Sequence, residues 1–242
     1  MFVPLRDSAE LRVIRFQTVT TILIVLNVAV YALMQFLLTD VGQHNTQLAL
    51  GAIPAVLTGH AQLAAELQWI PELLTPVTSL FMHAGWMHLL GNMLFLWVFA
   101  DNVEDGLGHG WFLLFYLICG LAGVMLHTLF SPQSQLPLIG ASGAISGVLA
   151  AYLLLFPRSK VVALLFGVVP VHLSAIWLLI AWVAYQLVFF FIDQHAGVAW
   201  DAHIGGFAAG LVLALAFKRH MQWRLSVGEV ARERHGKRRH WT

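Results

Sequence analysis

Residues 140–156 read GASGAISGVLAAYLLLF, an apolar segment that opens with a serine set between small residues. A helix over residues 141–156 would rise about 24 Å, less than the roughly 30 Å of hydrocarbon in a bilayer. A hydroxyl in hydrocarbon is costly unless it finds a hydrogen-bond partner or lines a wet cavity. Ser142 is therefore expected to begin a short helix below the membrane surface, in a cavity lined by protein.

The composition of the whole chain agrees with a membrane environment. Of the 242 residues, 59% are hydrophobic and 10% are charged, whereas about 25% of the residues of a soluble domain are charged. So few charges cannot cover a surface that faces water, and one membrane domain is the simplest arrangement. The single cysteine, Cys119, excludes an internal disulfide. Because Arg12 and Arg15 lead into an apolar segment long enough to span, no cleavable signal peptide is expected.

Six apolar segments are candidate spans, since a spanning helix needs about 20 mostly apolar residues. They cover residues 17–38, 77–100, 111–130, 141–156, 170–192 and 197–217. The predicted fold is all-α, a polytopic membrane protein of six transmembrane helices with a short central fourth helix. The predicted divisions are an N-terminal segment 1–16, a membrane domain 17–217 and a basic tail 218–242.

The basic residues predict the orientation of these spans. All 13 Lys and Arg residues precede the first span, lie between the fourth and fifth, or follow the sixth. Basic residues accumulate on the cytoplasmic side, so segments 1–16 and 218–242 are both predicted to be cytoplasmic. Segment 39–76 then lies outside, either in the lipid headgroup interface or as a helical cap on the bundle. For the basic tail, a solvated end near anionic lipid is favoured over a nucleic-acid site.

Polar side chains inside the spans are candidates for function, because lipid makes them costly. The second span carries His83, His88 and Asn92, the fourth carries Ser142, and the sixth carries His203. In the predicted topology these three spans run in the same direction and bring the polar groups to a similar depth. His88 and Asn92 are four residues apart and share one face of their helix.

These residue types suit nucleophilic chemistry by a serine. A serine hydroxyl is a weak nucleophile until a base takes its proton, and the imidazole of His203 titrates in the right range. The free N–H groups at a helix N-terminus, with the His88 ring and the Asn92 amide, are suited to stabilise an oxyanion. Glycine pairs would let the fourth and sixth spans approach closely. The pairs are Gly143 with Gly147, and Gly206 with Gly210.

In their order along the chain, these motifs resemble those of the rhomboid intramembrane serine proteases, over roughly residues 12–217. The resemblance rests on His83 and on four short runs. The runs are HLLGN at 88–92, NVE at 102–104, GASG at 140–143 and AHIGG at 202–206. The ordered set is a specific signal, whereas a lone serine motif of this kind recurs in unrelated hydrolases.

The resemblance implies a rhomboid-like bundle in which Ser142 is the nucleophile and His203 the general base. It implies that His88, Asn92 and the Ser142 amide stabilise the oxyanion, with no metal and no cofactor. The implied substrates are single-span membrane proteins, cleaved in their transmembrane segment near the outer leaflet of a lipid bilayer. The implied location is a bacterial inner membrane. Residues expected to support the site structurally are His83, Gly143, Gly147, Gly206 and Gly210.

The sequence leaves the orientation of the base open. Many family members carry an aromatic residue four positions after the serine, stacked on the base, and here that position is Ser146. The ring of His203 must then be oriented by Phe207, by Trp200 or by a hydrogen bond. Residues two apart on a helix do not face each other. Asp201 is therefore interpreted as an exposed boundary residue, and the site as a Ser-His dyad.

Three rival functions can be weighed against these residues. A non-catalytic relative that binds transmembrane helices should lack the nucleophile or the base, and this chain has both. A metal site of His83, His88 and His203 lacks the four-residue histidine spacing and the adjacent glutamate of the zinc proteases. A transporter with broken helices often shows an inverted repeat, and none is visible. The sequence names neither the natural substrate nor the oligomeric state.

Overall fold

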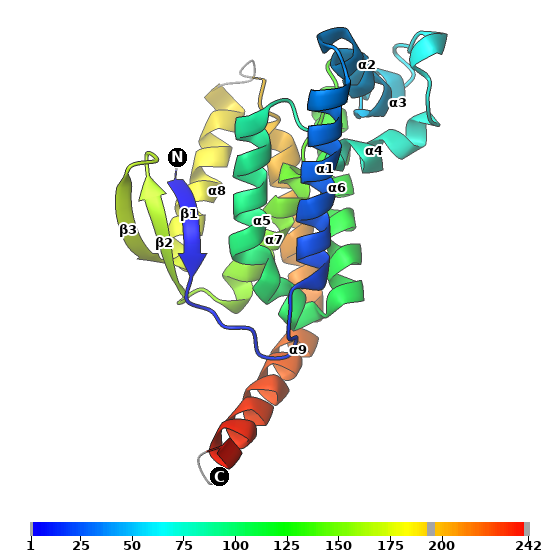
Figure 1. The fold of residues 1–242 in the computed structure, drawn as a ribbon. Helices are drawn as coiled ribbons and strands as arrows, with labels where there is room; N and C mark the ends of the chain where they lie inside the picture. The colour runs from blue at the N-terminus through cyan, green and yellow to red at the C-terminus, as the bar shows by residue number, and fades with distance from the viewer. Residues whose placement is uncertain (1, 193–196, 240–242) are drawn as a thin grey trace.

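The computed structural model describes residues 2–192 and 197–239, which form a bundle of long helices with a small sheet at one side (Figure 1). This confirms the predicted polytopic helical bundle. The helices that correspond to the six predicted spans are α1 (Thr18–Leu37), α5 (Trp86–Leu107), α6 (His109–Phe130), α7 (Ser142–Leu155), α8 (Ala175–Ile192) and α9 (Trp200–Arg239).

Shorter elements occupy the connections. Between α1 and α5 these are α2 (Asp40–Leu50), α3 (Pro54–Leu57), η1 (Ala65–Leu67), η2 (Glu72–Leu74), α4 (Thr75–Thr78) and η3 (Ser79–Phe81). The sheet consists of β1 (Phe2–Asp7), β2 (Lys160–Leu165) and β3 (Val169–Ser174), paired antiparallel in the order β1-β2-β3.

The short helix α7 lies at the centre of the bundle. It has 14 residues, and every residue from Gly143 to Tyr152 is buried. A helix that is buried all round must be apolar all round, which explains its run of Ala, Ile, Val and Leu. Helices α5, α6 and α9 pack against it. The prediction of a short fourth helix inside the bundle is thereby confirmed.

Among the residues that the structure describes, four helices are long and apolar enough to cross a membrane: α1, α6, α8 and the part of α9 from Trp200 to Arg232. Helix α7 is shorter. Helix α5 has 22 residues, and its last two turns carry Asp101, Glu104 and Asp105. The six predicted spans therefore include two helices that do not qualify by length and composition alone. Helix α7 is buried, and α5 packs against it but leaves Met87 and Leu90 exposed.

The second predicted span, 77–100, is displaced along the chain relative to α5. The helix begins at Trp86, after the turns of α4 and η3, and continues to Leu107. Its acidic end is stable because the carboxylates accept backbone hydrogen bonds. Glu104 accepts from the N–H groups of Val19 and Thr20 in the first turn of α1, at 2.9 and 2.8 Å. A carboxylate there satisfies free donors and complements the helix dipole.

The sheet was not expected from the sequence. The segment between the fourth and fifth spans forms the β2–β3 hairpin, so α8 begins at Ala175 rather than at residue 170. Strand β1 pairs with β2 and brings Phe2 into the core against Phe95 of α5. The first residues of the chain are thus part of the folded domain, beside α5 and α8 (Figure 1).

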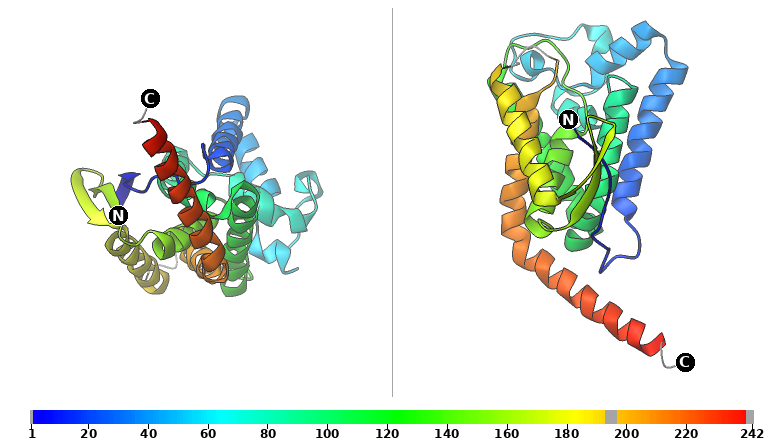
Figure 2. Two further views of the ribbon diagram at one scale, coloured as in Figure 1. Left: turned by 90° about the horizontal axis from the view of Figure 1, so that it is seen from below. Right: turned by 90° about the vertical axis from the view of Figure 1, so that its left-hand side faces the viewer.

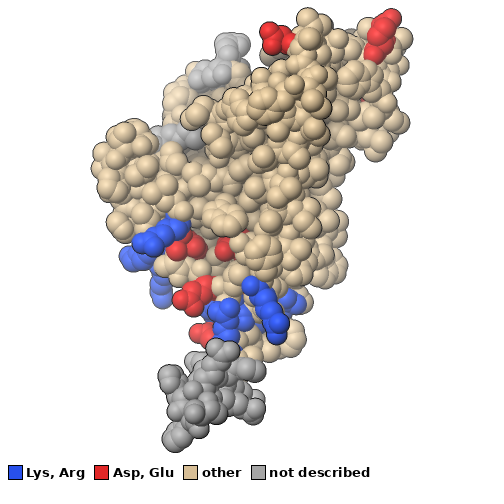
Figure 3. All heavy atoms as spheres, in the orientation of Figure 1, with Lys and Arg blue, Asp and Glu red and all other residues tan. Residues whose placement is uncertain are grey.

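Helix α9 continues without a break past residue 217, where the membrane domain was predicted to end. Its second half projects beyond the other helices (Figure 2). On the face seen in Figure 3, the Lys and Arg side chains gather at this end of the bundle. The N-terminal segment reaches the same end, since Arg12 Nη1 lies 2.8 Å from Glu229 Oε2 of α9.

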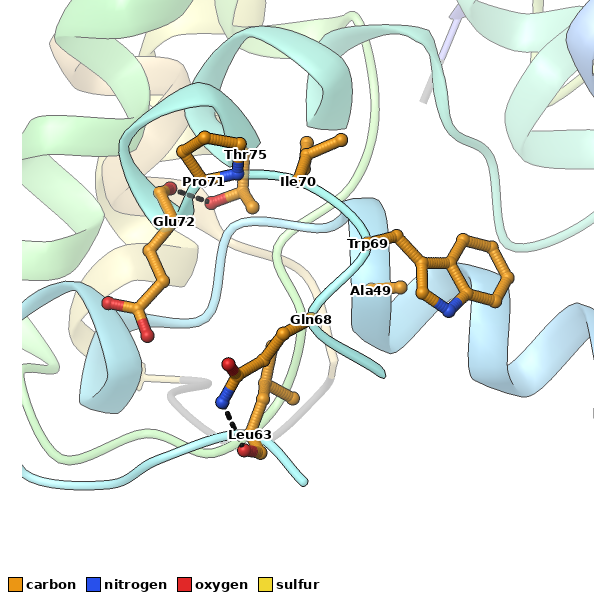
Figure 4. Close-up of a pocket in the computed structure, with 8 residues that line it drawn as sticks. All are labelled: Ala49, Leu63, Gln68, Trp69, Ile70, Pro71, Glu72 and Thr75. Carbon is orange, nitrogen blue, oxygen red and sulfur yellow. Dashed lines mark hydrogen bonds between the residues drawn. The ribbon is translucent and has the colours of Figure 1, made fainter. Parts of the chain in front are cut away.

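The long connection 39–76 lies at the opposite end of the bundle and contains α2 and α3 (Figure 1). It forms a helical cap, which is one of the two alternatives given by the sequence. The cap contains a hollow of about 320 Å³ lined by Leu63, Gln68, Trp69 and Glu72 among others (Figure 4). The residues that line this hollow all belong to the connection and α4, and none is a predicted site residue.

Candidate active site

The site is built where the first turns of α7 and α9 meet. Ser142 is the first residue of α7 and His203 lies in the first turn of α9. The Ser142 hydroxyl donates to His203 Nε2 over 2.8 Å. The two residues come from segments 61 positions apart in the chain, so this contact depends on how closely the two helices pack.

The glycine pairs make that close packing possible. A methyl group at Gly206 would overlap the backbone carbonyl of Gly143, and one at Gly210 would overlap the backbone of Gly147. The four glycines predicted from sequence therefore face one another along the contact of α7 and α9. Small residues allow this approach in lipid, where van der Waals packing is a main source of helix association.

Gly140 turns the chain into α7 just before the serine. Its φ of 130° is a conformation that other L-residues rarely adopt. A side chain there would also strike the His88 ring, since an added Cβ would lie 2.8 Å from His88 Nε2. The first N–H groups of α7 have no partner within the helix, and they begin next to Ser142.

His88 and Asn92 reach this turn from α5. A Cβ at Gly140 would lie 2.8 Å from His88 Nε2 and 3.7 Å from Asn92 Nδ2. The Asn92 amide donates to His83 Nε2 over 2.9 Å, and the rings of His83 and His88 stand edge to face at 5.1 Å. The structure thus brings the predicted polar groups of α5 next to the start of α7, with His83 behind Asn92.

Gln186 of α8 is a site residue that the sequence analysis missed. Its Oε1 accepts a hydrogen bond from His203 Nδ1 over 2.7 Å. Of the orienting groups expected for His203, a hydrogen bond is therefore present, from a partner that was not named. The ring of Trp200 also stands edge-on to His203 at 6.1 Å. Phe207 instead contacts Trp182, and Trp182 lies 6.3 Å from the His203 ring.

Ser146, which occupies the position of the missing aromatic ring, has a different partner. Its hydroxyl donates to the carbonyl oxygen of Ser142 over 2.6 Å. This is a local bond within the helix, one turn back, of the kind that serine often makes. The Ser146 hydroxyl is therefore hydrogen-bonded within α7.

The interpretation of Asp201 as an exposed residue is wrong. Its side chain is buried and accepts from His127 Nδ1 and from the Ala202 N–H, both over 2.8 Å. A carboxylate in the first turn of α9 complements the helix dipole, and the bond to His127 ties α9 to the end of α6. Asp201 therefore has partners outside the Ser142–His203 contact.

The arrangement offers a hydroxyl, a nitrogen acceptor and hydrogen-bond donors around one small volume. Ser142, His88 and His203 are each partly exposed, so the group is reachable from outside the protein. A hydroxyl within hydrogen-bond reach of an imidazole, which is held in turn by a third group, is the general geometry of an activated nucleophile. Within residues 2–192 and 197–232, no three His, Cys, Asp or Glu side chains are grouped as metal ligands would be.

Comparison with known proteins gives consistent matches over this region. A family model described as the Rhomboid domain matches residues 70–220. Rhomboid protease GluP of Bacillus subtilis is 39% identical over 127 residues, which are 52% of this chain and 23% of that protein. The mitochondrial Rhomboid protein 1 of Saccharomyces cerevisiae is 28% identical over 170 residues, which are 65% of this chain and 46% of that protein.

A third relative is nearer to this chain in length. The Putative rhomboid protease YdcA of Bacillus subtilis is 29% identical over 158 residues, which are 65% of this chain and 72% of that protein. Over the first two relatives, by contrast, the match spans only about a quarter and about half of their length.

Proposed function

The chain belongs to the rhomboid family, and from this premise we propose that it is an intramembrane serine protease with a Ser142–His203 dyad. The observation that supports the dyad most directly is the 2.8 Å hydrogen bond between Ser142 Oγ and His203 Nε2. A hydroxyl and an imidazole are costly to place inside an apolar bundle, so both are candidates for a functional role.

In the proposed reaction, His203 removes the proton of Ser142 Oγ as this oxygen attacks the carbonyl carbon of the scissile peptide bond. The tetrahedral intermediate collapses, the imidazolium gives its proton to the leaving nitrogen, and the acyl group stays on Ser142. His203 then takes a proton from water as the water oxygen attacks the ester carbon. When the bond from this carbon to Ser142 Oγ breaks, the imidazolium returns its proton to Oγ and the second product leaves as a carboxylic acid. Each half-reaction returns the ring to its neutral form.

The developing negative charge needs donors aimed at one point. The Ser142 N–H at the start of α7, the His88 ring and the Asn92 amide are the donors we propose. His88 and Asn92 both approach Gly140, two residues before the nucleophile. Preorganised donors of this kind supply a large share of catalysis, because they need no rearrangement as the charge develops.

The proposed substrates are single-span membrane proteins, cleaved near the outer end of their transmembrane segment. Ser142 opens a helix of only 14 residues, so its hydroxyl lies below one end of the bundle, and because Ser142 is partly exposed, water can reach it. That end also carries the cap formed by α2 and α3, away from the gathered Lys and Arg residues (Figure 3). If the basic end is cytoplasmic, the site faces the outer half of an inner membrane.

The test is cleavage by the purified protein in detergent and in liposomes. A fluorescently tagged single-span protein serves as substrate, and a fluorophosphonate probe reports the reactive serine. Wild type should cleave the substrate and take up the probe, and Ser142→Ala should do neither. The cleavage rate should fall toward acid pH, since only the neutral imidazole can act as base.

Thermal unfolding of both proteins checks that Ser142→Ala remains folded. Cleavage by folded Ser142→Ala at the wild-type rate would overturn the proposal. A folded wild type that neither cleaves nor takes up the probe would favour the rival function, a non-catalytic protein that binds transmembrane helices.

A further inference from the structure

The second half of α8 buries one residue, and that residue is polar. Of residues 180–192, all of which the structure describes, Gln186 alone is buried, with 5% of its surface exposed. The residues that follow it point outward, with Leu187 43% exposed and Val188 52% exposed. An amide in such a helix needs a hydrogen-bond partner inside the protein, because lipid offers none.

The partner of Gln186 is the ring of His203, and the contact decides which ring nitrogen carries the proton. Gln186 Oε1 lies 2.7 Å from His203 Nδ1, and Nε2 of the same ring lies 2.8 Å from Ser142 Oγ. A carbonyl oxygen is an acceptor only, so the nitrogen that it faces bears the hydrogen. In a neutral imidazole the other nitrogen is then bare. The bare nitrogen is Nε2, the atom that must receive the proton of Ser142.

The other described neighbours of the ring include two indoles and an acid. The indoles of Trp182 and Trp200 lie more than 6 Å from the ring by their centroids, and an indole N–H donates without accepting. They limit how the ring tilts. Asp201, the nearest acid in sequence, accepts from His127 and from the backbone of Ala202. The carbonyl of Gln186 is thus the acceptor that meets Nδ1.

We infer that Gln186 is the positioning residue of this site, which holds His203 in the tautomer and orientation that Ser142 needs. This inference rests on the proposed function. Gln186 contacts the base and acts through it, in the place that a third, acidic residue takes in a triad. Because Gln186 belongs to α8 while Ser142 and His203 belong to α7 and α9, the base is held in place only while α8 is packed against α9.

Kinetics of three variants test the role. Gln186→Met has nearly the same shape and removes the acceptor, so kcat should fall about 10- to 100-fold with little change in KM, since the loss of one ordering hydrogen bond affects the chemical step. Gln186→Glu restores an acceptor and should recover much of kcat. Its carboxylate also favours the protonated ring, so the acid limb of its pH profile should move to higher pH. Leu187→Ala, one residue along and exposed, should retain wild-type kcat.

A spectroscopic measurement separates this inference from the proposed protease activity. In protein labelled with ¹⁵N-histidine, long-range ¹H–¹⁵N correlation spectra distinguish protonated from bare ring nitrogens. In Ser142→Ala, which needs no activity, His203 should still show a protonated Nδ1 and a bare Nε2. In Gln186→Met combined with Ser142→Ala, the ring should become a mixture of tautomers.

The outcomes are distinct. A His203 tautomer unchanged by Gln186→Met, or a folded Gln186→Met with wild-type kcat, would overturn the positioning role and leave the protease proposal intact. Equal losses in Gln186→Met and Gln186→Glu, with no displacement of the pH profile, would also overturn it, because that is the pattern of a residue needed only for packing. If the wild type proves inactive, or if Ser142→Ala cleaves at the wild-type rate, the protease proposal fails and the tautomer result stands by itself.

Discussion

At the scale of single residues, the polar side chains of the bundle are linked across helices. Asn92 bonds to His83, Ser142 to His203, His203 to Gln186, and Asp201 to His127. Buried polar groups are nearly always hydrogen-bonded, because an unmade bond is expensive where water is absent. In this protein the bonds of Asn92, His203 and Gln186 also hold these groups near the start of α7, whereas the bond between Asp201 and His127 ties α9 to α6.

The oxyanion role that we propose for Asn92 leads to a prediction about kcat. Asn92→Ala removes a donor that approaches Gly140, so kcat should fall about 10²- to 10³-fold while KM changes little, since the bond forms only as charge develops. Steady-state cleavage kinetics measure both. The matched control is Gly91→Ala, the preceding residue, where an added methyl group meets no atom within 4 Å. A variant with a raised KM and an intact kcat would assign Asn92 to substrate binding instead.

The sequence was better at identifying the residues of the candidate site than at predicting which residues on other helices they bond to. Ser142 and His203 were identified because a polar residue in an apolar span is costly, and the 2.8 Å contact brings them together. Gln186 carries the same signal within α8, yet no spacing rule joined it to His203. Asp201 was misjudged because helix spacing excludes a contact between residues two apart, such as Asp201 and His203. Helix spacing does not predict contacts with other helices, and Asp201 is bonded to His127 of α6. Partners on distant helices depend on the packing of the bundle.

At the scale of elements, the helices of the six predicted spans were predictable and their limits were not. Hydropathy identifies apolar segments, but it does not predict that α5 extends through the charged residue Glu104. That carboxylate is stabilised because it accepts hydrogen bonds from the free N–H groups at the start of α1. These N–H groups lie some 85 residues earlier in the chain. Strand β3 was interpreted as the start of the fifth span, at residue 170, since an apolar strand and an apolar helix look alike over six residues. Strand β1, by pairing with β2, then orders the first residues.

The contact of α7 with α9 leads to a prediction about helix spacing. Gly206→Ala places a methyl group against the Gly143 carbonyl, which should push the helices apart and lengthen the Ser142–His203 contact. A displacement of about 1 Å can cost about 10²-fold in rate, so cleavage and probe labelling should both fall by that order. Gly110→Ala on α6, where an added methyl group meets no atom within 4 Å, is the control. Full activity in Gly206→Ala would show that the two helices can separate without harm to the dyad.

At the scale of the whole molecule, the segment that follows β1 and the projecting part of α9 lie at one end of the bundle (Figure 1). Arg12 pairs with Glu229, and the Arg12, Val13 and Ile14 amides donate to Asp105 at the end of α5. Surface ion pairs contribute little, but bonds from three backbone amides to a buried carboxylate fix the segment. Residues 8–16 and the projecting part of α9 must therefore face the same side of a membrane, and the cap of α2 and α3 faces the other.

This arrangement predicts which residues a reagent can reach in intact cells. Cys119 is fully buried, so the wild-type protein should not react with a maleimide that cannot cross membranes. Glu66→Cys lies exposed in the cap and should react in intact cells. Ser226→Cys, exposed on α9, should react only after the membrane is permeabilised, because the basic end is predicted to be cytoplasmic. Glu10→Cys, in the N-terminal segment, should react under the same conditions as Ser226→Cys.

The opposite labelling pattern would show that the protein has the reverse orientation in the membrane, with Ser142 in the inner half of the bilayer. The proposed cleavage near the outer leaflet would then be wrong, even if Ser142 and His203 form the dyad.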